Sequence, residues 1–364
     1  MVIRLFRGRG NRKAGAMVKN RIRLRKNHQA LVNQLARIAQ LLEQGYPLTI
    51  ALSFIKLHAS IEHQQLYAKV EEDLKAGVSV SEAFEVFALP NDVLSFIYFY
   101  EQQGDLAKAF KQASDLYRKK EKTKKELSKI LRYPLVLIWI TVLMSLMLQQ
   151  FIAPHLTQMF LSFQGTPPFI TSLFFLVIDF MPLFSVSLIG TVFVIGIYYL
   201  YVIKKSNASR KMNLLLKIPL IKSFMKQILT YFFALQLGHL LESGMSVRHA
   251  LSIFENQHYL SFFREEVSLI KSELIQGHSL FEIMSTRTFF MNELALVIEN
   301  GERTGYLGKD LQSYSELLFF DLEDKIQKLF AMIQPAFFIL MGGFVLFLFL
   351  AVMLPMFTLI GTLN

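Results

Sequence analysis

Two short stretches carry an acidic residue followed by a glycine and a leucine at fixed spacing. They are Glu101-x-x-Gly104-x-Leu106 and Gly301-Glu302-x-x-Gly305-x-Leu307. A carboxylate at such a place has two uses: it can cap or solvate a helix end, or it can bind a basic residue of a partner. We expect the glycines to end helices, because glycine tolerates the left-handed conformation that a helix end requires. For Glu302 both interpretations stay open.

Catalytic and cofactor-binding patterns are missing from the sequence. There is no Gly-x-x-x-x-Gly-Lys-Ser/Thr loop for ATP phosphates and no His-Glu-x-x-His zinc motif. The chain has no cysteine, which excludes disulfides, Fe–S ligands and cysteine nucleophiles. Its eight histidines are scattered, and we interpret His58, His63, His239 and His249 as satisfied surface or bundle residues. The sequence therefore predicts no enzyme, no metal and no cofactor.

The chain repeats itself at a spacing near 200 residues. Matching segments are Leu42-Glu43-Gln44-Gly45 with Leu241-Glu242-Ser243-Gly244, Gly77-x-Ser79-x-x-Glu82 with Gly277-x-Ser279-x-x-Glu282, Glu101-x-x-Gly104 with Glu302-x-x-Gly305, and Pro134 and Pro154 with Pro335 and Pro355. The offset grows from 199 to 200 and then 201, which two single-residue insertions explain. Matches in this order indicate two parallel copies of one domain.

Each copy has the pattern of a helical bundle. Leu31, Leu35, Ile38 and Leu42 share one helical face. Gly45 and Gly244 stand where a helix should stop, and Ser79-x-x-Glu82 and Ser279-x-x-Glu282 each have the form of a capping box that opens a helix. No convincing run of alternating strand residues is present. We expect residues 27–131 and 224–333 to be compact bundles of five or six short helices each.

The charges are confined to two blocks of the sequence. Lys and Arg number 24 in residues 1–132, none in 133–203, 15 in 204–333 and none in 334–364, and Asp179 is the one acid in the two uncharged blocks. A soluble domain would distribute charges over its whole surface, whereas uncharged segments of about 20 residues cross membranes. We place Asp179 near the outer face, in a wet interfacial position beside Pro182.

The basic flanks set the expected topology. The first 26 residues hold ten Lys and Arg, and the positive-inside rule places basic flanks in the cytoplasm. We attribute the net charge of +11 to this retention and to anionic lipid, and we expect no direct nucleic-acid binding. The expected order is a basic cytoplasmic tail (1–26), bundle 1 (27–131), a first span (132–153), an external or interfacial segment (154–182), a second span (183–203), a basic cytoplasmic linker (204–223), bundle 2 (224–333), a third span (334–360) and an external tail (361–364). The fold class is thus an all-α membrane protein with two repeated cytoplasmic bundles, three transmembrane helices, the N-terminus inside and the C-terminus outside.

The second copy resembles a known family. Gly301-Glu302-Arg303-Thr304-Gly305-Tyr306-Leu307 is similar to the Gly-Glu-x-Ser/Thr-Gly-x-Leu signature of the general secretion pathway protein F and type IV pilus assembly protein C family. Pro335 and Pro355, as the residues that open and close a span, also fit that pattern. So does Ile218-Pro219-Leu220-Ile221, although Lys222 departs from it. In the first copy Tyr100 and Gln103 replace the first glycine and the Ser/Thr.

The resemblance implies a function. Members are membrane platform proteins whose cytoplasmic domains contact a hexameric assembly ATPase and whose membrane part engages pilin-like subunits. The resemblance also implies a homo-oligomer in the cell membrane. The short basic start and the entry from Gln34 to Leu48 look like the Gram-positive competence branch, in which the platform supports a pseudopilus for DNA uptake.

Two other classes remain as alternatives. A transporter or channel with parallel repeats would need polar residues along its spans, and the first and third predicted spans have no charged residue. A receptor would need a sizeable outer domain, which the apolar segment 154–182 does not provide.

Overall fold

The computed structural model describes residues 28–152, 154–155, 158, 212, 216–217 and 219–362. Over this part of the chain every regular element is a helix, which confirms the all-α prediction at that level. Several predicted segments lie outside the described residues. They are the basic tail 1–26, most of the external segment 154–182, which includes Asp179 and Pro182, the second span 183–203 and most of the linker 204–223.

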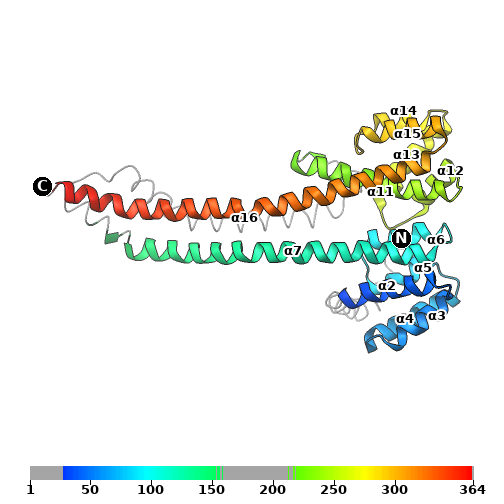
Figure 1. Cartoon of the computed structure of the whole chain (residues 1–364), viewed down its shortest axis with the longest axis horizontal. Coiled ribbons are helices and arrows are strands. Elements are labelled where there is room, and N and C mark those ends of the chain that lie inside the picture. Colours follow the sequence, from blue (N-terminus) through cyan, green and yellow to red (C-terminus); the bar gives the residue numbers. More distant parts are fainter. Residues whose placement is uncertain are drawn as a thin grey trace, which may run out of the picture. The chain divides into compact units, whose positions relative to one another are not determined.

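The helices form two compact units. The first unit holds the described residues up to Lys124 together with those from 212 to Leu322, and the second holds the remainder. The helices before the first long helix are α2 (His28–Glu43), α3 (Leu48–Leu57), α4 (Ile61–Lys75), α5 (Val80–Ala83), the 3₁₀ helix η2 (Phe84–Phe87) and α6 (Asn91–Glu101). The helices before the second are α11 (Pro219–Glu242), α12 (Val247–Asn256), α13 (Ser261–Ile275), α14 (Leu280–Thr286) and α15 (Glu293–Thr304). Figure 1 shows them as short helices beside the labelled long helices α7 and α16.

Glycine ends the first helix of each copy, as the sequence predicts. Gly45 and Gly244 both have φ of +88°, a conformation that costs glycine little. After α2, the Gly45 N–H donates to Leu42 O and the Tyr46 N–H donates to Leu41 O, both at 3.0 Å. This pair of bonds satisfies carbonyls that the helix itself leaves open.

The two predicted capping boxes differ. At α14 the box is complete, because Ser279 Oγ accepts from the Glu282 N–H at 3.1 Å and Glu282 Oε2 accepts from the Ser279 N–H at 3.0 Å. At α5 Ser79 Oγ accepts from the Glu82 N–H at 3.3 Å, but a return bond from Glu82 is not among the bonds of the described residues. The first prediction is therefore only half correct.

Aromatic side chains join the two copies into one continuous core within the first unit. Phe99 on α6 packs against Phe254 on α12 with ring centroids 4.5 Å apart, and Phe96 packs against Phe232 on α11 at 5.8 Å. The buried face predicted from Leu31, Leu35, Ile38 and Leu42 is confirmed for the first three, and Leu42 is partly buried against the same core. The helices of residues 28–101 and those of residues 219–304 thus share apolar surface, which sequence periodicity did not predict.

Two long helices run through both units. α7 spans Leu106–Met147 and continues as a π-helical turn to Ile152, and α16 spans Leu307–Thr362. We expected Pro335 to open a membrane span and Pro355 to close it; α16 itself continues as a helix through both residues. An interior proline removes one backbone hydrogen bond, and long apolar helices tolerate that loss when the neighbouring turns readjust.

One helix among the described residues, Leu307–Phe347, is long and apolar enough to cross a membrane. Only 6% of its most apolar window is buried inside the protein. Apolar side chains left open along this helix include Ile339, Leu340 and Val345. A surface of this kind fits hydrocarbon rather than water.

Candidate functional site

The Gly301–Leu307 motif forms the turn between α15 and α16. Gly305 is the residue after α15 and has φ of +78°, which confirms it as a helix-end glycine. Gly301 lies inside α15 and is buried, so its prediction as a helix-end residue was wrong. A Cβ added at Gly301 would lie 2.6 Å from Leu307 Cα. Glycine is needed there because the start of α16 passes too close for any side chain.

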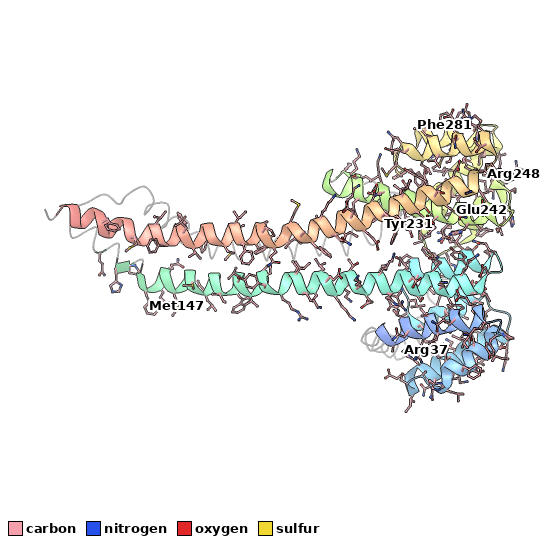
Figure 2. All side chains as sticks on the ribbon, viewed as in Figure 1. Arg37, Met147, Tyr231, Glu242, Arg248 and Phe281 are labelled. Atoms are coloured by element: carbon pink, nitrogen blue, oxygen red, sulfur yellow. The ribbon has the colours of Figure 1, made fainter. Side chains whose placement is uncertain are left out.

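Two further glycines bring α11 against the start of α16. A Cβ at Gly238 would lie 2.9 Å from Gly308 O, and one at Gly308 would lie 3.0 Å from Glu242 N. Glu242 ends α11, and the chain turns there into α12, which carries Arg248 (Figure 2). Sequence reasoning missed both glycines. The available signal was that the first copy also has small residues at the matching positions, Ala39 and Ala107.

Glu101 has a structural role that no local pattern predicted. Its Oε1 accepts a hydrogen bond from the Val80 N–H at 2.5 Å, and its Oε2 accepts one from the Ser81 N–H at 3.0 Å. These two donors open α5, where the helix has no internal partners for them. Glu101 therefore ties the end of α6 to the start of α5, where it satisfies two N–H groups that a capping box does not reach.

Glu302 is the residue of the second copy that matches Glu101, but it does not cap a helix among the described residues. Its side chain is exposed, and no hydrogen bond or ion pair is recorded for it within the described part of the chain. Partial burial by neighbouring atoms raises the pKa of its carboxyl. The Ser279–Glu282 box satisfies the N–H groups of Ser279 and Glu282 at the start of α14, and no bond from Glu302 to that helix is among the bonds of the described residues.

The surroundings of Glu302 are polar and exposed. Arg303 donates to Asn300 Oδ1 at 3.3 Å, and Asn300 donates to Asp310 Oδ2 at 3.0 Å. Tyr306 leaves 65% of its surface open. Among the described residues no three His, Asp or Glu side chains gather as metal ligands would. Within the described residues this surface therefore offers an exposed carboxylate at Glu302 beside a polar, hydrogen-bonded cluster.

The histidines are held as predicted where the structure gives them partners. His63 is buried, and its Nδ1 lies 2.8 Å from Gln34 Oε1; His58 Nδ1 lies 3.1 Å from Phe54 O. His239 on α11 packs against the Tyr100 ring at 5.2 Å. Burial, and to a lesser extent Lys108, lowers the pKa of His239, against the effect of Asp105, to a net value of about 4.

Comparison with known proteins gives a consistent result. The family model of type II secretion system protein F matches residues 35–154 and 233–355. A ComG operon protein 2 homolog of Halalkalibacterium halodurans is 35% identical over 323 residues, covering 89% of this chain and 100% of that protein. ComG operon protein 2 of Bacillus subtilis is 29% identical, covering 86% and 97%. Type II secretion system protein F of Pseudomonas aeruginosa is 24% identical, covering 89% and 81%.

The matched ranges contain both acidic motifs, with Glu101 in the first and Glu302 in the second. They also contain the start of α16 and most of its apolar length. The chain belongs to the family of type II secretion system protein F.

Proposed function

We propose that this protein is the membrane platform of a type II secretion or type IV pilus-like machine, and specifically of a competence pseudopilus used in DNA uptake. It couples a cytoplasmic assembly ATPase to the assembly of pilin-like subunits. The similarity to ComG operon protein 2 over nearly its whole length supports the competence branch. The hydrolysis of ATP belongs to the ATPase and not to this chain.

The observation that carries the proposal is the continuity of α16. Its first turn packs on Gly301 and Gly238 in the first unit, and the same helix continues into the apolar stretch with no break until Thr362. A continuous helix transmits a displacement of its base along its axis, whereas a flexible joint would absorb it. One unbroken helix therefore belongs to both units of the chain, which supports a role in coupling.

The membrane arrangement that we propose has three spans, with the N-terminus inside and the C-terminus outside, and two repeated cytoplasmic bundles. It rests on the distribution of Lys and Arg along the sequence. Because the chain has no cysteine, single cysteines can be labelled in intact cells with an impermeant thiol reagent. Ser162→Cys and Asn364→Cys should react from outside, and Ser209→Cys should not. Labelling of the Ser209 variant from outside would refute this arrangement.

The coupling is tested by interrupting α16 between the polar and apolar parts. Four glycines inserted after Gln327 should break the helix, since each costs about 1 kcal/mol relative to alanine. Four alanines inserted at the same place keep the helix and add slightly more than one full turn. We expect the glycine variant to bind the ATPase but to assemble no pseudopilus, and the alanine variant to retain assembly. Normal assembly by the glycine variant would show that α16 transmits nothing.

A further inference from the structure

Helix α3 is apolar on both faces, although only one face meets the core. Its inner residues Ala51, Leu52 and Ile55 are buried. On the outer face Ile50, Phe54 and Leu57 leave 44%, 46% and 74% of their surfaces open, and the row is extended by Tyr46 at 44% and Ile61 at 76%. We name these five exposed residues the α3 face. The spacing of four and three residues places Ile50, Phe54 and Leu57 on one side of the helix.

The second copy shows that the fold does not require this face to be apolar. At an offset of 199, Ile50 matches His249 and Leu57 matches Asn256, and both of these are exposed polar residues. Phe54 matches Ile253, which is 5% exposed because α6 lies over it, with the Tyr98 hydroxyl donating to Ile253 O at 3.2 Å. The same helix face is thus polar where water meets it and apolar where another helix covers it.

Charges near the α3 face are already neutralised within the chain. Lys56 lies 2.8 Å from Glu71, and the Tyr46 and Phe54 rings pack edge to face with centroids 6.2 Å apart. A surface with no charge in its apolar row can meet an identical surface across a twofold axis without like-charge repulsion. The arrangement within the chain does not extend to a second molecule, since the residues of α15 that match Tyr98 and Phe99 are Glu299 and Asn300.

We propose that the α3 face is a dimer interface, on which a second copy of this chain docks its own α3 face. Its five side chains leave about 570 Å² exposed, since each large apolar side chain has roughly 200 Å² of surface. Two faces together would bury about 1,100 Å², the lower end of specific protein interfaces. Such a contact pairs and separates readily, which suits an assembly whose subunits rearrange.

Single cysteines test the pairing in the full-length protein, which has none of its own. Phe54→Cys and Leu57→Cys, purified and returned to lipid vesicles, should be joined into covalent dimers by a short bismaleimide. The matched control is Asn256→Cys, an exposed residue at the equivalent place in the second copy. We expect at least fivefold more dimer for the better of the two α3 variants. Equal yields from Leu57→Cys, Phe54→Cys and Asn256→Cys would overturn the proposal.

A second variant exchanges the residues between copies. Ile50→His with Leu57→Asn places on α3 the residues that α12 already exposes, so the bundle should keep its melting temperature. Energy transfer between donor- and acceptor-labelled chains in vesicles should fall at least threefold relative to the unmodified protein. Unchanged energy transfer with a folded double variant would contradict the proposal. So would cross-linking in cells that joins Leu57→Cys to another protein while the purified chain forms no dimer.

Discussion

The two copies differ at one matched position, which is apolar in the first copy and charged in the second. Phe87 in the first copy matches Arg287 in the second at an offset of 200. Phe87 is 2% exposed and packs on the Tyr67 ring, with centroids 4.8 Å apart. Arg287 lies between two carboxylates, 3.2 Å from Glu266 Oε1 and 2.5 Å from Glu273 Oε1.

The difference has an energetic consequence. Apolar packing gains stability from burial alone, whereas a buried ion pair must offset the cost of removing two charges from water. Glu266 is 2% exposed, and this burial raises the pKa of its carboxyl, against the effect of Arg287. The second copy is therefore the more sensitive of the two to the loss of one partner and to pH.

The largest effect is expected from removing Arg287. Arg287→Met leaves the Glu266 charge buried without its partner and should lower the free energy of unfolding by about 3–5 kcal/mol at pH 7. The loss should shrink on acidification, because a protonated Glu266 no longer carries an unpaired charge. The measurement is chemical denaturation of the full chain in detergent at pH 7 and pH 5.

The control for Arg287→Met is a double variant that carries the residues of the first copy at the two matched positions. Glu266→Leu combined with Arg287→Phe introduces the residues found at Leu66 and Phe87 and removes both charges. This double variant should recover most of the stability lost by Arg287→Met. A double variant no more stable than the single one would show that these residues are not interchangeable between copies.

A smaller loss is expected at Gly301, where the first copy has Tyr100. Gly301→Ala places a Cβ 2.6 Å from Leu307 Cα and should cost about 1–3 kcal/mol through displacement of the start of α16. Gly342→Ala is the control, since nothing lies within 4 Å of its added Cβ. Equal stability of the two variants would mean that Leu307 moves away without cost.

Part of the pH dependence of the protein's stability is expected to come from His239, which lies at the contact between the copies. Its pKa of about 4 in the folded chain lies below the ordinary value near 6.5, so the unfolded chain binds the extra proton between these values. Stability should therefore fall as pH decreases from 7 to 5, by up to about 2 kcal/mol for this residue. His239→Gln, the residue of the first copy at Gln40, should reduce that slope. An unchanged slope would assign the acid sensitivity to other groups.

The smallest effects on stability are expected at Glu101 and Glu302, and they should differ between these two residues. Glu101→Gln keeps one acceptor oxygen and should lose about 1 kcal/mol, because one backbone donor of α5 stays unpaired. Glu302→Gln should change stability by less than about 0.5 kcal/mol and yet reduce pseudopilus assembly and binding of the ATPase. If Glu302→Gln leaves stability, binding and assembly all unchanged, the carboxylate has no role in partner contact.

Local features of the fold were predictable because their causes lie within a few residues. Gly45 and Gly244 end helices through their own backbone freedom, and Ser279 and Glu282 complete a box three residues apart. Glu101 was not recognised as a cap, since its donors Val80 and Ser81 lie some 20 residues away in sequence.

Long-range packing overrode other local rules. Gly301 was predicted as a helix-end residue, but a glycine is needed there because the Leu307 backbone lies too close for a side chain. The contact of Phe99 with Phe254 joins two copies that the sequence could only describe separately.

The unpaired carboxylate of Glu302 has a consequence in proton linkage. Its pKa is raised in the free protein, and a cation placed beside it by a partner would lower that pKa again. Formation of the contact would then release protons at pH values near the raised pKa. By linkage, the partner would bind more tightly as pH increases through that range and more weakly as it decreases. A neutral glutamine at position 302 would remove this dependence, so acidification would act on the contact through a single carboxyl.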